Sequence, residues 1–257
     1  MSTFVRLVTS GAAVNITRRV VMAITCLAVF QSFASAQGTI SNGEILTGAV
    51  TGSQVASWSF YADRGNSTVC AGASVVGPPV SGFVPWLIIY NPDGTVLRAL
   101  VNGNIAVRVC ATPLMQTGMY RVTVRNYFAA TQPNLTKTFT VTLALPSKPY
   151  VVPNGGSGGW MARGAVYSGT ITLAEIGQWS FGATQGDRLT VTMTDPANSP
   201  DFVPWVMLFA PDGSDLAGTY NNTTATIVYT ARQTGTYTVL AMDRNPAVVA
   251  NYTLMVK

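Results

Sequence analysis

The sequence predicts an all-β protein in which two tandem antiparallel β-sandwich domains, of jelly-roll or immunoglobulin-like topology, follow a signal peptide. Three observations predict this organisation: a leader with an apolar run, a set of motifs that occurs twice in the same order, and short alternating segments separated by turns. Only 10% of the residues are charged and 48% are apolar. This composition suits an exported, β-rich protein.

Residues 1–36 have the order of a secretory signal peptide. Arg18 and Arg19 close a basic segment, the apolar run 20–33 follows, and the small residues Ala-Ser-Ala occupy 34–36. The run is shorter than the roughly 20 residues that span a bilayer, so we expect no membrane span after processing. The expected location is therefore secreted, periplasmic or at the cell surface.

The leader also contains one cysteine and three arginines that processing would remove. Cys26 follows a segment that matches a bacterial lipoprotein cleavage box poorly, which leaves lipid anchoring as an alternative. Loss of Arg6, Arg18 and Arg19 lowers the net charge from +5 to about +2. A charge this small, spread along the chain, does not indicate a nucleic-acid partner.

Five motifs of residues 37–145 return in residues 160–257 at an offset of about 111 to 121 residues, which predicts two copies of one domain. The segment 146–159 between them is rich in proline and glycine and has the composition of a linker. The motifs are Trp-Ser-Phe at 58–60 and 179–181, Phe-Val-Pro-Trp at 83–86 and 202–205, Pro-Asp-Gly at 92–94 and 211–213, Thr-Gly-x-Tyr at 117–120 and 234–237, and x-Thr-Leu at 141–143 and 252–254.

Within each copy the pattern predicts about seven or eight short strands. Alternation of apolar and polar residues is clearest in the second copy, where it places strands over 179–183, 189–193, 236–240 and 252–256. The Pro-Asp-Gly segments predict turns, because proline fixes φ and glycine accepts a positive φ.

In this order the motifs resemble the bacterial pre-peptidase C-terminal domain, an accessory module of secreted proteases and other exoenzymes. The second copy carries the closer match, from the glycines at 164–169 through the Pro-Asp-Gly turn to the closing Tyr-Thr-Leu, and the first copy matches more weakly over about 43–145. The resemblance implies a β-sandwich without catalytic residues of its own. Members of this family often carry acidic residues before the apolar strand and near the first aromatic strand, and some of these residues bind calcium.

Asp201 precedes Phe-Val-Pro-Trp in the second copy, with Asp195 nearby, whereas Ser81 and Gly82 occupy the corresponding place in the first. Calcium needs six to eight oxygen ligands, so main-chain carbonyls or waters would have to complete a site. Two interpretations stay open: calcium ligands, or solvated acids of a loop. No other cofactor is expected.

Two cysteines follow the leader, and an oxidising compartment favours their pairing. When residues are counted from Phe60 and Phe181, Cys70 falls opposite Val191, and a count back from the Thr-Gly motifs places Cys110 opposite Ile227. We therefore predict a Cys70–Cys110 disulfide inside the core of the first copy. Two buried free thiols are the alternative.

The chain contains no histidine. This excludes Ser-His-Asp and Cys-His nucleophilic sites and the usual zinc ligand sets, because those mechanisms need an imidazole. A pair of carboxylates could still hydrolyse a glycoside, but most of the ten acids stand in predicted turns. We expect a protein that is not an enzyme.

The strand before each Pro-Asp-Gly turn is apolar on both faces, so something must cover the second face. A loop, a neighbouring strand or the other domain could do so. Alternatively, Trp86 and Tyr90, with Trp205 and Phe209 in the second copy, form a platform for sugar rings or for a partner protein. We expect a binding or accessory protein for a polysaccharide or a cell-surface component, and the alternative is an envelope spacer without a ligand.

Overall fold

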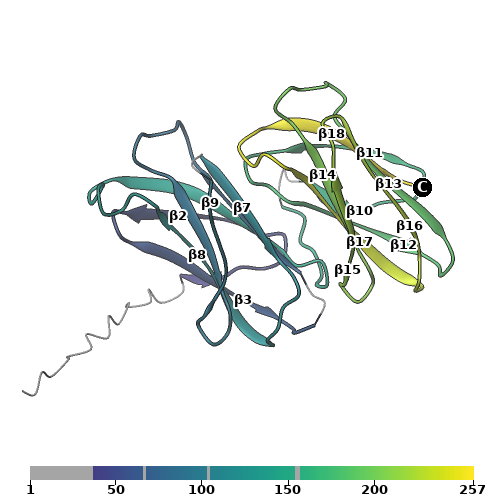
Figure 1. Cartoon of the computed structure of the whole chain (residues 1–257), viewed down its shortest axis with the longest axis horizontal. Coiled ribbons are helices and arrows are strands. Elements are labelled where there is room, and N and C mark those ends of the chain that lie inside the picture. Colours follow the sequence, from purple (N-terminus) through teal and green to yellow (C-terminus); the bar gives the residue numbers. More distant parts are fainter. Residues whose placement is uncertain (1–36, 66–67, 103–104, 154–156) are drawn as a thin grey trace, which may run out of the picture. The chain divides into compact units, whose positions relative to one another are not determined.

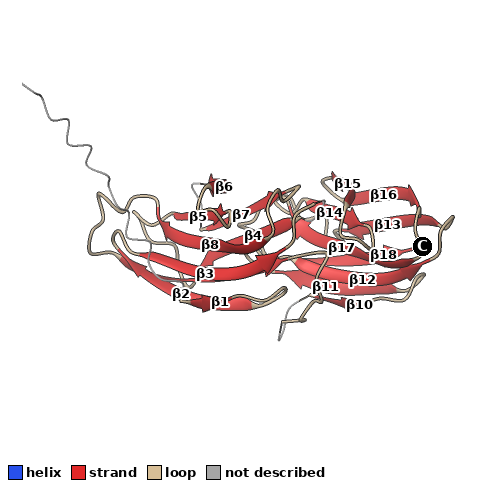
Figure 2. Ribbon diagram, turned by 90° about the horizontal axis from the view of Figure 1, so that it is seen from below, coloured by secondary structure: helices blue, strands red, loops and turns tan. Residues whose placement is uncertain are grey.

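The computed structural model describes residues 37–257 except 66–67, 103–104 and 154–156. All of these residues belong to one compact unit, Ala34–Lys257. The predicted signal peptide, 1–36, lies outside the described residues. In the described part every regular element is a strand, as Figure 2 shows, and no helix is long and apolar enough to cross a membrane.

The first copy folds as two packed sheets that together contain nine strands (Figure 1). The five-stranded sheet has the order β1-β3-β8-β5-β6 and the four-stranded sheet the order β2-β9-β4-β7. The strands are β1 (Gly38–Thr39), β2 (Ile45–Thr51), β3 (Val55–Ala62), β4 (Val69–Val75), β5 (Pro85–Tyr90), β6 (Val96–Val101), β7 (Ala106–Ala111), β8 (Gly118–Asn126) and β9 (Thr136–Ala144).

The second copy repeats this topology strand for strand. Its sheets have the orders β10-β12-β17-β14-β15 and β11-β18-β13-β16. The strands are β10 (Gly158–Trp160), β11 (Val166–Ile171), β12 (Gly177–Ala183), β13 (Arg188–Thr194), β14 (Pro204–Phe209), β15 (Asp215–Tyr220), β16 (Thr224–Thr230), β17 (Gly235–Asp243) and β18 (Ala250–Val256). All four strands predicted in this copy are present.

The all-β sandwich prediction is confirmed, and the topology decides between its two variants. Apart from the short first strand of each copy, the chain passes between the two sheets in the jelly-roll manner, with β2, β4, β7 and β9 in one sheet and β3, β5, β6 and β8 in the other. Each sandwich also has one parallel pair at an edge of its five-stranded sheet, because β1 pairs parallel to β3 and β10 parallel to β12. These edge strands have two and three residues, too few to show alternation in the sequence.

The Thr-Gly-x-Tyr motif holds the turn end of each sandwich together. Tyr237 is buried, stacks on Phe181 at a centroid distance of 5.9 Å and donates its hydroxyl to the Gln233 carbonyl at 2.8 Å. A Cβ on Gly235 would lie 2.9 Å from Pro211 of the Pro-Asp-Gly turn, so only glycine permits this approach. The first copy repeats the arrangement with Tyr120, Phe60, Gln116, Gly118 and Pro92. The motif is therefore structural.

Each sandwich has its own apolar core, and a third buried cluster joins residues of both. This interface cluster lies on the outward faces of β4 and β7 from the first sandwich and of β14 and β17 from the second. A Cβ on Gly72 of β4 would lie 2.2 Å from the Ala174 carbonyl, so the two backbones meet closely here. The buried members are Cys70, Ala144, Ile176, Met207, Phe209, Leu240 and Met242, with Cys110 and Trp205 packed against them.

Arg108 of the first sandwich is a buried charged residue that contacts the second sandwich. Its Nη1 donates to the Glu175 carbonyl at 3.1 Å, and its guanidinium carbon lies 5.5 Å from the centroid of the Trp205 ring. Burial lowers the pKa of Arg108 to about 10, and the negative charge of Asp243 opposes that shift.

The Cys70–Cys110 disulfide is present, but its predicted place in the core is wrong. The two cysteines are paired neighbours on β4 and β7, with Val69 and Ala71 turned into the core on either side of Cys70. Register pairs Ala71 with Leu143 and Met193 with Leu254, so Cys70 corresponds to Thr192, one position beyond Val191. A shift of one residue reverses the face of a strand. The disulfide therefore lies in the interface cluster.

Candidate functional site

Strands β5 and β14, which precede the Pro-Asp-Gly turns, present their two faces as predicted. Leu87 and Ile89 lie in the core of the first sandwich, and Val206 and Leu208 lie in the core of the second. The opposite face carries the tryptophan of each Phe-Val-Pro-Trp motif. What lies over that outward face differs between the two sandwiches.

In the first sandwich an aromatic group surrounds Trp86, and we call Trp86, Arg125, Tyr127 and Phe128 the first cluster. Tyr127 meets the Trp86 ring edge to face at a centroid distance of 5.7 Å, and Phe128 meets Tyr127 in the same way at 5.1 Å. Tyr127 is 51% exposed and Phe128 is 43% exposed. Three contiguous rings thus reach the surface at the end of β8.

An arginine caps the tryptophan of this cluster. The guanidinium carbon of Arg125 lies 3.6 Å from the centroid of the Trp86 ring, which is a stacking distance. Four residues back on the same strand and face, Arg121 lies over the Tyr90 ring at 4.8 Å. The two predicted platform residues of the first copy are therefore each covered on one ring face by an arginine of β8.

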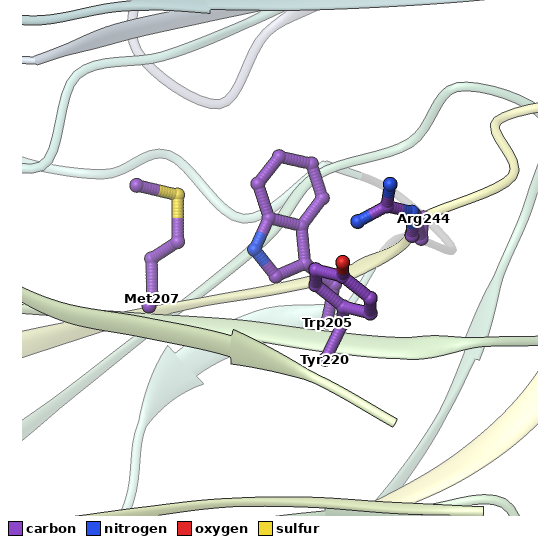
Figure 3. Close-up of a pocket in the computed structure, with 5 residues that line it drawn as sticks. Trp205, Met207, Tyr220 and Arg244 are labelled. Atoms are coloured by element: carbon purple, nitrogen blue, oxygen red, sulfur yellow. The ribbon is translucent and has the colours of Figure 1, made fainter. Parts of the chain in front are cut away.

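In the second sandwich a hollow of about 490 Å³ opens beside Trp205, and the residues that line it form the second cluster: Trp205, Met207, Gly218, Tyr220 and Arg244. Arg244 lies over the Tyr220 ring at 3.8 Å, and Tyr220 is 50% exposed. Figure 3 shows the Trp205 ring between the side chains of Met207 and Arg244. This end of the sheet is open, whereas the other end is covered by the first sandwich.

The two clusters combine the same residue types at different positions. Trp86 and Trp205 are equivalent, because each follows the proline paired with the last residue of β8 or β17. By the same register Arg125 corresponds to Met242, and Arg244 corresponds to Tyr127. The tyrosine and the arginine beside each of these equivalent tryptophans therefore come from different positions in the two sandwiches.

Phe209 is fully buried in the interface cluster and Tyr90 is partly buried under Arg121. The structure therefore brings Trp205 of the predicted platform to the open hollow and leaves Phe209 beneath the first sandwich. Tyr127, Phe128, Tyr220 and both arginines of the clusters were not predicted from the sequence. Alternation within β8 marks Arg125 as an outward residue, but Tyr127 and Phe128 lie in a loop that periodicity does not place.

Asp195 serves its own loop. Its Oδ1 accepts a hydrogen bond from the Ala197 N–H at 2.9 Å and its Oδ2 accepts one from the Ser199 N–H, while Asp201 is exposed. Among the described residues no group of three or more His, Cys, Asp and Glu side chains could hold a metal ion. Calcium binding at Asp195 and Asp201 stays a prediction from the sequence.

No known protein family and no curated protein matches the chain. Among solved structures, the pre-peptidase C-terminal domain of collagenase from Bacillus anthracis is similar at 12% identity and a TM-score of 0.34, over 41% of this chain and 99% of that one. The tandem CBM51 modules of a family 98 glycoside hydrolase from Streptococcus pneumoniae are similar at 12% identity and a TM-score of 0.27, over 81% of each chain. The CUB1-EGF-CUB2 region of human MASP-1/3 is similar at 9% identity and a TM-score of 0.21, over 82% of this chain and 99% of that one. Values at this level assign neither a family nor a ligand.

Proposed function

We propose that this chain is an exported, non-catalytic binding protein that holds a polysaccharide, or another component of a cell surface, on exposed aromatic side chains. The observation that carries the proposal is the first cluster, where the rings of Trp86, Tyr127 and Phe128 touch in sequence and reach solvent. A contiguous exposed apolar patch of this kind is typical of an interaction surface.

The chemistry of these rings suits sugars. An aromatic face stacks on the C–H face of a pyranose ring, and a tyrosine adds a hydroxyl that can form hydrogen bonds with the ligand. Tyr220 and Trp205 offer a second such pair beside the hollow of the second cluster. Two aromatic sites on one chain would bind a repeating polymer more tightly than either site alone, because the second contact becomes intramolecular.

Two further features support a binding role and export. The absence of histidine removes the imidazole-based mechanisms, and the repeated motifs that resemble the pre-peptidase C-terminal family serve the fold through turns and core contacts. The Cys70–Cys110 disulfide is compatible with an oxidising compartment. We place the protein outside the cytoplasm on these grounds.

Co-sedimentation of the chain from Gln37 onward with insoluble cellulose, chitin, xylan and isolated cell envelopes tests the proposal. We expect binding to at least one of these, weakened about tenfold or more by Trp86→Ala and by Tyr127→Ala. Trp160→Ala is the matched control, because Trp160 is a 64% exposed tryptophan outside both clusters. Failure to bind any of the four materials would favour a spacer protein instead.

A further inference from the structure

The first sandwich carries an excess of positive charge that its acids do not neutralise. Residues 37–145 contain six arginines and lysines but only three acids. Each acid has other partners: Glu44 accepts from the Ser41 N–H at 2.8 Å, Asp63 pairs with Lys148, and Asp93 accepts from Thr95 and Gln116. In contrast, the acids outnumber the bases in residues 160–257.

Part of this positive charge belongs to the first cluster, where it lies beside the aromatic rings. Arg125 forms no salt bridge with any acid that the structure describes. Its Nε is buried and has no hydrogen-bond partner among the described residues. Its stacking on Trp86 holds the planar guanidinium against the ring, and the residue is partly exposed. A guanidinium held in this way recognises a carboxylate or sulfate with two parallel hydrogen bonds and loses little side-chain entropy on binding.

The Arg125 guanidinium and the aromatic rings lie close enough to contact one ligand. The Arg125 guanidinium carbon and the Tyr127 ring centroid lie 3.6 Å and 5.7 Å from the same Trp86 ring. Arg121 continues the positive row along β8, with Thr123 between the two arginines on the same face. A chain of sugars that stacks on the rings would therefore place its charged groups over β8.

From this combination we infer that the first sandwich binds an anionic polysaccharide, carboxylated or sulfated, with Arg125 on the acidic group and Tyr127 and Phe128 against the sugar rings. The inference rests on the proposed function and narrows its ligand class. It also assigns the two clusters different roles, because the sandwich that carries the second cluster has more acids than bases.

Isothermal titration with dextran sulfate and with uncharged dextran of the same length tests the inference. The wild-type protein should bind dextran sulfate at least tenfold more tightly than dextran. Arg125→Gln should reduce the affinity for dextran sulfate about tenfold, as expected for the loss of a charge-assisted hydrogen bond. Arg98→Gln is the matched control, since it removes an equal charge from an exposed position on edge strand β6 of the same sandwich.

Three outcomes would overturn the inference. The first is equal affinity for dextran sulfate and dextran. The second is equal loss in Arg98→Gln and Arg125→Gln, which would mean attraction by net charge alone. The third is equally tight binding of single-stranded DNA, which would mean a general polyanion site. If neutral polysaccharides still bind in a Trp86-dependent manner, the proposed function survives each of these results, and thermal melting of each variant separates lost binding from lost folding.

Discussion

Asn126 and Asp243 occupy equivalent positions in the two sandwiches, since each ends its strand opposite the proline of the Phe-Val-Pro-Trp motif. The Oδ1 of each side chain accepts two main-chain N–H groups. Asn126 also donates through Nδ2 to the Gly82 carbonyl at 2.9 Å, whereas Oδ2 of Asp243 is buried without a hydrogen-bond partner in the described part of the chain. The second sandwich therefore holds a carboxylate with one unpartnered oxygen where both polar atoms of the amide in the first are hydrogen-bonded.

Asp243→Asn should stabilise the protein by about 1 kcal/mol at pH 7, because the new amide can donate to the Asp201 carbonyl, the equivalent of Gly82. Burial raises the pKa of Asp243 above 3.8, even with the attraction of Arg108 included. The folded state therefore holds this proton more tightly than the unfolded state, and stability falls as the pH rises above about 4. The gain in Asp243→Asn should be largest at neutral pH and shrink below pH 4. Urea unfolding of both proteins at pH 3.5 and pH 7 measures this, and Asp201→Asn is a control at an exposed site. A loss of stability at pH 7 would contradict the argument.

At the scale of elements, the sequence predicts strands well where one face is buried and the other is polar. This holds for β12, β13 and β18, whereas β17 is also predicted but buries Leu240 and Met242 on its outward face. It fails for the short edge strands β1 and β10. It also fails for the face of Cys70, because the chain has one residue fewer between Phe60 and Cys70 than between Phe181 and the equivalent Thr192. Side chains in loops, such as Tyr127, have no period that could have placed them.

Removal of the disulfide by Cys70→Ala with Cys110→Ala should lower the free energy of unfolding by about 4 kcal/mol, because the closed loop spans 40 residues. Guanidinium unfolding with and without reductant measures the loss. Reductant should destabilise the wild-type protein and leave the double variant unchanged. Alkylation of the unfolded wild-type protein without reduction should add no mass at either cysteine, and a mass shift there would rule out the bridge.

At the scale of the whole molecule, the repeat predicts two similar sandwiches but not how their surfaces are used. The outward faces of β14 and β17 carry Met207, Phe209, Leu240 and Met242, which the sequence alone cannot assign to a ligand or to an internal interface. Both alternatives need an apolar surface. In the structure the first sandwich covers most of this face, and a hollow opens beside Trp205.

Because of this interface we expect the two sandwiches to unfold together in one transition. Gly72 is the best position at which to disturb the interface. A side chain there would point at the Ala174 carbonyl of the other sandwich and away from the core of its own sandwich. Gly72→Val should cost about 1 to 3 kcal/mol of overpacking at the interface. Thr226→Val is the control, since it puts the same side chain on an exposed outward position of β16. Differential scanning calorimetry should show one transition for the wild-type protein and the control but two for Gly72→Val. A single transition at an unchanged temperature in Gly72→Val would mean that the sandwiches unfold independently of this contact.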